Sequence, residues 1–192
     1  MKLACLLTAA GSGSRFGGDK LRLPVAGQPM GIHALDVLQS SLFALRVLVT
    51  SIDKGYMIEA ARERGFAVVI NPAPEKGMSS SVRLGTAHIC QTGAYDGILY
   101  AVADQPHLKA GTVEQLVKAF EKEPDCILAP ESNGKRGNPV LFPASLFEEL
   151  LNVMGDRGGR QVIAAHPDLL RTIAVPSEEL QDIDTKEDMQ SC

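Results

Sequence analysis

The residues of this sequence with the clearest chemical potential follow its first apolar run, in the stretch LLTAAGSGSRFGGDK at residues 6–20. Four glycines fall within residues 11–18, and two cations, Arg15 and Lys20, accompany them. Glycine lets backbone N–H groups approach a phosphate closely. Arginine offers a flat fork of donors to phosphate oxygens, and lysine offers a compact charge. The stretch therefore predicts either a phosphate-binding loop or a plain turn with two solvated cations.

The two best-known phosphate loops do not fit this stretch. A dinucleotide-binding GxGxxG loop needs a third glycine where this chain has Phe16, and no strand ends in the acid that would bind a ribose. A Walker loop needs Lys and then Ser or Thr after its last glycine, but Gly18 is followed by Asp19, and Lys20 by Leu21. The sequence therefore predicts a glycine loop of another kind.

Two later segments contain carboxylates, which are hard oxygen ligands for a metal ion. Asp104 ends the apolar run in YAVADQPHL, where a carboxylate without a partner is unfavourable. Mg²⁺ prefers oxygen ligands and substrate phosphates. The segment LQDIDTKED carries four acids within residues 182–188. The alternatives are a helix N-cap for Asp104 and a solvated charged face for the later acids.

Two glycine-containing turns offer sites for further polar or anionic groups. In NPAPEKGMSSSVRLG, Gly77 breaks the chain, and the serines at residues 79–81 supply an N-cap and the start of a helix. Three serines are more than a cap needs. In GDRGGRQVI, Arg157 and Arg160 stand beside two glycines that open a helix, and they are candidates for holding a second anionic ligand. The alternative for this segment is a tight turn with surface arginines.

Short apolar runs alternate with longer amphipathic ones, which predicts an α/β fold with a mainly parallel sheet covered on both faces. No linker interrupts the pattern, so we expect a single domain over residues 1–192. In such sheets, ligands gather beyond the carboxyl ends of the strands, and four segments fall there, namely the glycine loop and residues 71–81, 103–107 and 181–188. We expect strands at residues 3–8, 45–51, 66–70, 97–103, 126–129, 138–142 and 170–175, and helices at 29–40, 56–64, 80–90, 112–121, 144–153, before His166 and after Thr185.

The composition excludes several classes of protein. The chain has 192 residues, 45% of them hydrophobic and 22% charged, with a net charge of −4, which is typical of a globular protein. General nucleic-acid and membrane-surface binders are normally basic, so we expect neither as a partner. The apolar run at the amino terminus is too short for a signal peptide or a membrane span, so we expect a cytoplasmic protein.

The four cysteines are too far apart in the sequence for a zinc knuckle or a CxxC redox motif. Cys5 and Cys126 stand inside apolar runs, and we expect both to be buried thiols.

The glycine loop and its continuation, TAAGSGSRFGGDKLRLPVAGQPM, resemble the signature of the MobA-like nucleotidyltransferases. That signature has small residues and a glycine after a strand, then Arg, Phe or Met, Gly and Lys at fixed spacing, followed by Leu and Pro. The matching segments span residues 3–188, nearly the whole chain. The resemblance implies a three-layer α/β/α, Rossmann-like nucleotidyltransferase fold with a mainly parallel, mixed sheet.

The resemblance also implies roles for individual residues in binding a nucleotide and a metal. Lys20 would stabilise charge at the α-phosphate, and Arg15 would hold the leaving pyrophosphate. Asp104 would act with them and, together with Asp184, would hold Mg²⁺. The other nucleotide-binding residues that the resemblance implies are Ala9, Ala10, Gly11, Ser12, Gly13, Asn71, Gly77 and Ser81.

Two segments resemble the part of the family signature that contacts the second substrate. In GKRGNPVLFP, this chain has Asn138 where the family usually has histidine. The segment GDRGGRQVI resembles Gly-Asp-x-Gly-Ala-Arg. The implied acceptor-binding residues are Asn138, Asp156, Arg157 and Arg160.

Within the family, the sequence is most similar to the molybdenum cofactor cytidylyltransferases. Those members resemble this chain in having Thr or Pro before Ala-Ala-Gly, whereas guanylyl members have Leu-Ala-Gly-Gly. The resemblance implies transfer of CMP from CTP to molybdopterin-bound molybdenum, with release of pyrophosphate and delivery of the product to a molybdoenzyme. The alternatives are transfer to another small phosphate acceptor, or an oxidoreductase or accessory protein on the same fold.

Overall fold

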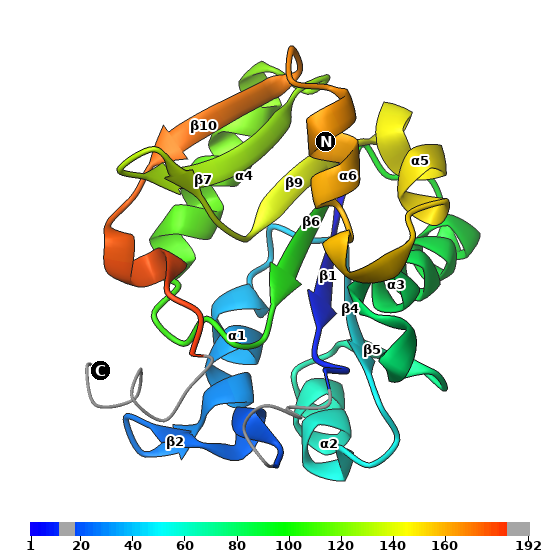
Figure 1. The fold of residues 1–192 in the computed structure, drawn as a ribbon, viewed down its shortest axis with the longest axis vertical. Helices are drawn as coiled ribbons and strands as arrows, with labels where there is room; N and C mark the ends of the chain where they lie inside the picture. The colour runs from blue at the N-terminus through cyan, green and yellow to red at the C-terminus, as the bar shows by residue number, and fades with distance from the viewer. Residues whose placement is uncertain (12–17, 184–192) are drawn as a thin grey trace.

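The computed structural model describes residues 1–11 and 18–183, and its centre is one twisted sheet (Figure 1). The strands lie in the order β10-β7-β9-β6-β1-β4-β5, and β8 pairs with β7. The β6-β1-β4-β5 part is parallel, whereas β9 runs antiparallel to both β6 and β7. The expected mainly parallel, mixed sheet is therefore confirmed. Its strands are β1 (Leu3–Thr8), β4 (Leu45–Thr50), β5 (Ala67–Ile70), β6 (Gly97–Val102), β7 (Ile127–Ser132), β8 (Lys135–Arg136), β9 (Val140–Pro143) and β10 (Leu170–Ala174).

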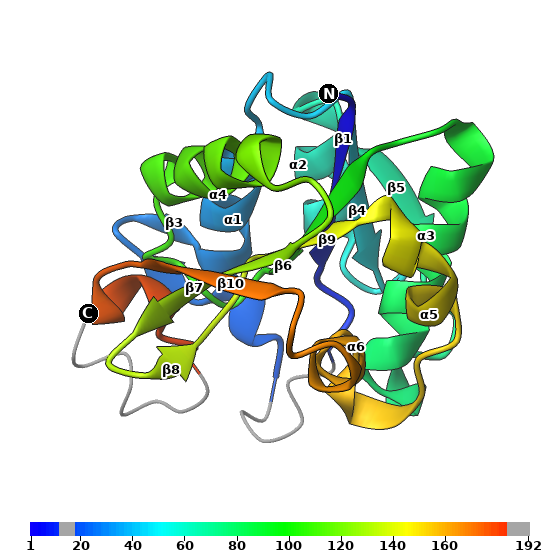
Figure 2. The same ribbon diagram turned by 90° about the horizontal axis from the view of Figure 1, so that it is seen from above.

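Helices cover both faces of the sheet, which gives the expected three layers (Figure 2). The buried apolar residues form two clusters, one on each face, because successive strand side chains point to opposite sides. In β1, Cys5 and Leu7 belong to one cluster, and Ala4 and Leu6 to the other. The first cluster packs against α1 (Met30–Leu38), α2 (Gly55–Glu63) and α4 (Ala110–Lys122), and the second against α3 (Met78–Thr92), α5 (Phe147–Leu151) and α6 (Arg160–Ala165).

Several short elements were not expected from the sequence. A hairpin joins β2 (Pro24–Val25) to β3 (Gln28–Pro29), and its turn residues Ala26 and Gly27 both have positive φ. The single helix expected over residues 144–153 is instead a 3₁₀ turn, Ala144–Leu146, followed by α5. The short helix expected after Thr185 lies outside the described residues.

The start of α3 differs from the expectation that a serine caps it. Gly77 is the N-cap residue, with φ 85° and ψ 179°, and the three serines lie within the first turn of the helix. Ser80 Oγ donates to the Gly77 carbonyl at 2.8 Å instead of accepting from a free N–H group. The predicted serine N-cap is therefore wrong, because the glycine conformation starts the helix before the serines.

Two smaller expectations can be compared with the structure. Cys5 and Cys126 are buried free thiols, as predicted. Within the described ranges, every helix is too short or too polar to cross a membrane.

Candidate active site

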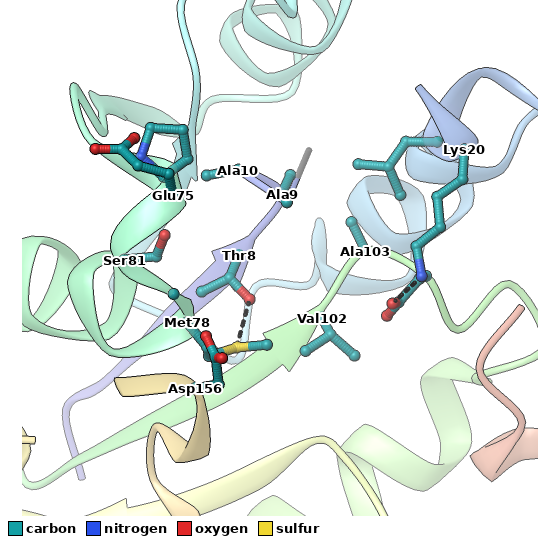
Figure 3. A pocket seen from close by; sticks show the side chains of 15 residues that line it. Thr8, Ala9, Ala10, Lys20, Glu75, Met78, Ser81, Val102, Ala103 and Asp156 are labelled. Carbon is teal, nitrogen blue, oxygen red and sulfur yellow. Dashed lines mark hydrogen bonds and ion pairs between the residues drawn. The ribbon is translucent and has the colours of Figure 1, made fainter. Parts of the chain in front are cut away.

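A cleft opens at the carboxyl ends of β1 and β6, where the parallel strands lead out of the sheet (Figure 3). It has a volume of about 440 Å³. Thr8 ends β1 and Val102 ends β6, and both line the cleft. The predicted site residues that also line it are Ala9, Ala10, Gly11, Lys20, Gly77, Ser81, Asp104 and Asp156. The cleft is where an α/β sheet is expected to bind its ligand.

A cation and a carboxylate from distant parts of the chain meet in this cleft. Lys20 opens a 3₁₀ turn, Lys20–Arg22, and Asp19 caps that turn by accepting from the backbone N–H of Leu21 at 3.2 Å. The Nζ atom of Lys20 lies 2.8 Å from Oδ2 of Asp104 (Figure 3). The pair is partly shielded from water, with exposed side-chain fractions of 19% and 24%. The two residues predicted to act together thus lie in direct contact.

The second carboxylate oxygen of Asp104 has no hydrogen-bond partner among the described residues, although it is buried. Asp104 is not the cap of the next helix, since α4 has Lys109 at that position. The backbone N–H of Ile183 donates to the Asp104 carbonyl at 3.1 Å. The chain that leads to Asp184 is therefore held beside Asp104 up to residue 183.

Some predicted site residues cannot be compared with the structure. Ser12, Gly13 and Arg15 of the glycine loop lie outside the described residues, and so does Asp184. Among the residues that are described, no group of three or more His, Cys, Asp or Glu side chains is arranged around a common point for a metal ion.

Lys54 is a residue of this region that sequence reasoning missed. Its ammonium donates to the Gly11 carbonyl at 2.8 Å and lies 3.3 Å from Oδ1 of Asp19. The residue is only 3% exposed and is not part of the cleft wall. Lys54 comes shortly after β4, which ends at Thr50, so it too lies beyond the carboxyl end of a central strand, which is the signal that would have found it.

The polar residues that follow β5 divide into one that lines the cleft and others that support it. Ser81 lines the cleft. Asn71 does not line it, because the residue is 2% exposed and its amide donates to Ser80 Oγ at 2.8 Å and Ser81 Oγ at 2.9 Å. The Asn71 carbonyl oxygen accepts from the N–H of Ala73 at 3.0 Å. Asn71 therefore orients the serines.

Gly77 and Asp156, which both line the cleft, lie close to each other. A Cβ atom built on Gly77 would lie 2.0 Å from Oδ1 of Asp156 and 3.1 Å from the carbonyl oxygen of Gly155. A larger residue would make the Asp156 carboxylate turn away, and only glycine readily adopts φ 85° with ψ 179°. The absence of a Cβ atom at Gly77 therefore lets Asp156 lie beside the start of α3.

A second cavity of about 170 Å³ adjoins the first. Its wall contains all four residues that were predicted to bind the acceptor, namely Asn138, Asp156, Arg157 and Arg160. The two cavities share Thr8, Met78, Val102 and Asp156 as lining residues. Their shared wall suits two substrates that meet between them.

Two aromatic side chains belong to the apolar part of the second cavity. Tyr100 and Phe142 both line it, and their rings meet edge to face with centroids 5.4 Å apart. The Tyr100 hydroxyl shares a 2.8 Å hydrogen bond with Oγ1 of Thr86. Burial raises the pKa of the Tyr100 hydroxyl well above its ordinary value. Tyr100 is therefore a neutral packing residue rather than an acid or base.

Comparison with known proteins assigns this chain to a family. The sequence pattern of the MobA-like NTP transferase domain matches residues 5–169. The chain is 32% identical to the purine catabolism protein PucB of Bacillus subtilis (strain 168), over 94% of this chain and 90% of that protein. It is 26% identical to a probable molybdenum cofactor guanylyltransferase of Pyrococcus horikoshii, over 82% of this chain and 76% of that protein.

A solved structure has the same fold at lower sequence identity. Rv0371c of Mycobacterium tuberculosis H37Rv matches with a TM-score of 0.85 and 24% identity, covering 100% of this chain and 96% of that one. A structure of the same protein in complex with manganese matches with a TM-score of 0.79 and 22% identity, covering 100% of this chain and 97% of that one. The chain belongs to the MobA-like NTP transferase family and is a nucleotidyltransferase.

Proposed function

We propose that the protein transfers CMP from CTP to the phosphate of molybdopterin-bound molybdenum, with release of pyrophosphate. The observation that carries the proposal is the wall shared by two cavities, one containing the Lys20–Asp104 pair and the other containing Arg157 and Arg160. One cavity suits a triphosphate with its metal, and the other suits the phosphate of an acceptor. In this proposal, residues 1–192 act as one nucleotidyltransferase domain.

The triphosphate of CTP would lie against the glycine loop. Backbone N–H groups of Gly11, Ser12 and Gly13 would cradle the phosphates, because glycine-rich backbone allows close approach. Arg15 would hold the β- and γ-phosphates, which leave as pyrophosphate. Lys20 would neutralise the charge that grows at the α-phosphate, which is the main contribution that a protein makes to phosphoryl-type transfer.

A divalent cation fits the carboxylate of Asp104. Its Oδ1 atom is buried and lacks a partner among the described residues, and a carboxylate oxygen is the type of ligand that Mg²⁺ prefers. Asp184 would supply the second carboxylate, since the preceding residue, Ile183, is bonded to the Asp104 backbone. When bound, Mg²⁺ neutralises phosphate charge and holds the triphosphate in one orientation.

The base of the nucleotide would lie near Ala9, Ala10, Gly77 and Ser81, with Asn71 orienting Ser81. The side chain of Ala10 lines the cleft and is nearly buried at 5% exposure. Its methyl group narrows the space in which the family resemblance puts the base. A pyrimidine fits such a space better than a purine, which favours CTP. The name of the Pyrococcus horikoshii relative favours GTP instead, so the base must be tested directly.

The acceptor would lie in the second cavity with its phosphate held by Arg157 and Arg160. The carboxamide of Asn138 and the carboxylate of Asp156 would orient its polar groups. An acceptor phosphate oxygen would attack the α-phosphorus of CTP, a new phosphorus–oxygen bond would form, and the bond to the bridging oxygen of the β-phosphate would break. Alignment of the two substrates would supply much of the acceleration.

A second candidate is the same transfer to a smaller phosphate acceptor, such as a sugar 1-phosphate. The second cavity holds only about 170 Å³, whereas sites for drug-sized ligands usually have about 300–1,000 Å³. That volume favours a small acceptor.

For the pterin acceptor, we propose that the reaction runs in the cytoplasm and that a molybdoenzyme receives the product.

The experiment is a pyrophosphate-release assay in which nucleotide and acceptor are varied independently. We expect release with CTP, Mg²⁺ and molybdopterin, and little release when GTP replaces CTP. Release with a sugar 1-phosphate but not with molybdopterin would establish the second candidate. Equal turnover of GTP and CTP would refute the role of Ala10 in base selection.

A further inference from the structure

Lys54 is a buried cation at an unfavourable position. It is 3% exposed, and lysine is almost never so buried without a charged or polar partner. It is also the N-cap residue of α2, where the helix macrodipole is positive. Both factors oppose a lysine at this position, so its contacts must compensate for them.

The contacts of Lys54 join the two ends of the glycine loop. Its Nζ atom donates to the carbonyl of Gly11 at 2.8 Å, on the amino-terminal side of the loop. The same atom lies 3.3 Å from Oδ1 of Asp19, on the carboxyl-terminal side. One ammonium group therefore fixes the separation of the residues where the loop leaves the sheet and where it returns.

A continuous set of contacts leads from Lys54 to the candidate catalytic pair. Oδ1 of Asp19 accepts the backbone N–H of Leu21 as well as contacting Lys54, so it caps the turn that begins at Lys20. Lys20 in turn contacts Asp104 at 2.8 Å. Displacing Asp19 would therefore move the start of the turn that carries Lys20.

We propose that Lys54 is a positioning residue for nucleotidyl transfer, which holds both ends of the phosphate loop and thereby sets the place of Lys20. The inference rests on the proposed role of the glycine loop. Lys54 is not itself a phosphate ligand, because it does not line the cleft and its ammonium is already bound by two oxygens. Ends of the loop that are held before the nucleotide arrives reduce the ordering cost of binding.

The test compares Lys54→Met, which keeps the length of the side chain and removes its charge, with Lys54→Arg and with Asp19→Asn. The matched control is Lys118→Met, in which the side chain is 71% exposed and its ammonium lies 3.9 Å from Glu114. Kinetics are measured well below the melting temperature of every variant. We expect Lys54→Met to raise KM for the nucleotide and lower kcat, with a loss in kcat/KM of about 100-fold, the size expected from a misplacement of 1 Å. The control should equal the wild type, and Lys54→Arg should recover part of the loss.

The double variant Lys54→Met, Asp19→Asn shows whether the two residues act together as a clamp, that is, as one contact that holds both ends of the loop, or affect kcat/KM independently. If the pair acts as one unit, the double variant loses little more kcat/KM than either single variant. Unchanged kcat and KM in Lys54→Met, with only a lower melting temperature, would overturn the proposal. If Lys54→Met does not fold, Asp19→Asn decides, and normal kinetics in that variant would overturn the proposal.

The experiment distinguishes a wrong choice of substrates from a wrong role for Lys54. All variants are assayed with whichever nucleotide and acceptor the wild type turns over, and nucleotide affinity is measured in parallel by calorimetry. A wild type that rejects CTP or molybdopterin refutes the proposed function, whereas the effect of Lys54 on the accepted nucleotide still tests the clamp.

Discussion

Replacing Gly77 with alanine tests whether the close approach between α3 and Asp156 is a real constraint on the fold. The backbone at Gly77 has φ 85° and ψ 179°, a region that is essentially limited to glycine. Holding another residue there costs about 1–3 kcal/mol. The added Cβ would also lie 2.0 Å from Oδ1 of Asp156 and 3.1 Å from a backbone oxygen of Gly155, so the Asp156 side chain must turn away.

The expected loss for Gly77→Ala is therefore about 1–3 kcal/mol in the free energy of unfolding, before any cost of moving Asp156. In a chain of this length, each kcal/mol lowers the melting temperature by about 2–4 °C, so a fall of about 2–12 °C is expected. Urea denaturation gives the free energy, and calorimetry gives the melting temperature. Because Asp156 lines both cavities, KM for the acceptor should also rise.

The control is Gly111→Ala in α4. A Cβ at Gly111 would meet no heavy atom within 4 Å, and the residue has no positive φ. Alanine is the better helix former, so this variant should equal the wild type or be more stable by up to about 1 kcal/mol. If Gly77→Ala were as stable as Gly111→Ala, the argument from backbone conformation and close approach at Gly77 would be refuted.

Three other predictions concern the core, the metal site and pH. Gly85→Ala should destabilise by about 1–3 kcal/mol in denaturation experiments through overpacking, because its Cβ would lie 2.2 Å from Cδ1 of Leu6. Asp104→Asn should weaken Mn²⁺ binding in calorimetry and lower kcat about 100- to 1,000-fold, as loss of one electrostatic group typically does; unchanged Mn²⁺ affinity would contradict the metal assignment. Burial raises the pKa of the Cys5 thiol above its ordinary value of 9.0, so stability is full below that pH and falls as the pH rises above it, when the unfolded thiol ionises and the folded thiol does not. The free energy of unfolding should fall by up to about 1.4 kcal/mol per pH unit, and by less in Cys5→Ala. An equal fall between pH 8 and 10 in the wild type and in Cys5→Ala, measured by urea titration at each pH, would count against this prediction.

The main elements of the fold were predictable because their patterns are local. Strands such as Leu3–Thr8 are continuous apolar runs, and helices such as Ala110–Lys122 repeat apolar residues at helical spacing. The β2–β3 hairpin was missed because each strand has only two residues and includes a proline, so neither has a periodicity to detect. The start of α3 was misjudged because serines are common N-caps, whereas here the conformation of Gly77 decides the boundary.

The candidate site was partly predictable for a different reason. The ends of parallel strands meet at one edge of a sheet, so Lys20 and Asp104 were expected near each other although they are far apart in the sequence. The separate placement of Asn138, Arg157 and Arg160 at a second cavity also agrees with the expected grouping. Lys54 belongs to no motif; its place after β4 is a sequence signal, but its contacts with both ends of a loop are seen only in the structure.

The most direct test of the account is mass spectrometry of the product formed from the wild type, Mg²⁺, molybdopterin carrying molybdenum and an equimolar mixture of CTP and GTP. We expect a dinucleotide that contains CMP, formed together with pyrophosphate. The yield of this dinucleotide should be greatly reduced with Asp104→Asn. A product that contains mainly GMP would contradict the choice of base. Absence of any dinucleotide, when the enzyme binds CTP with Mg²⁺, would contradict the molybdopterin acceptor.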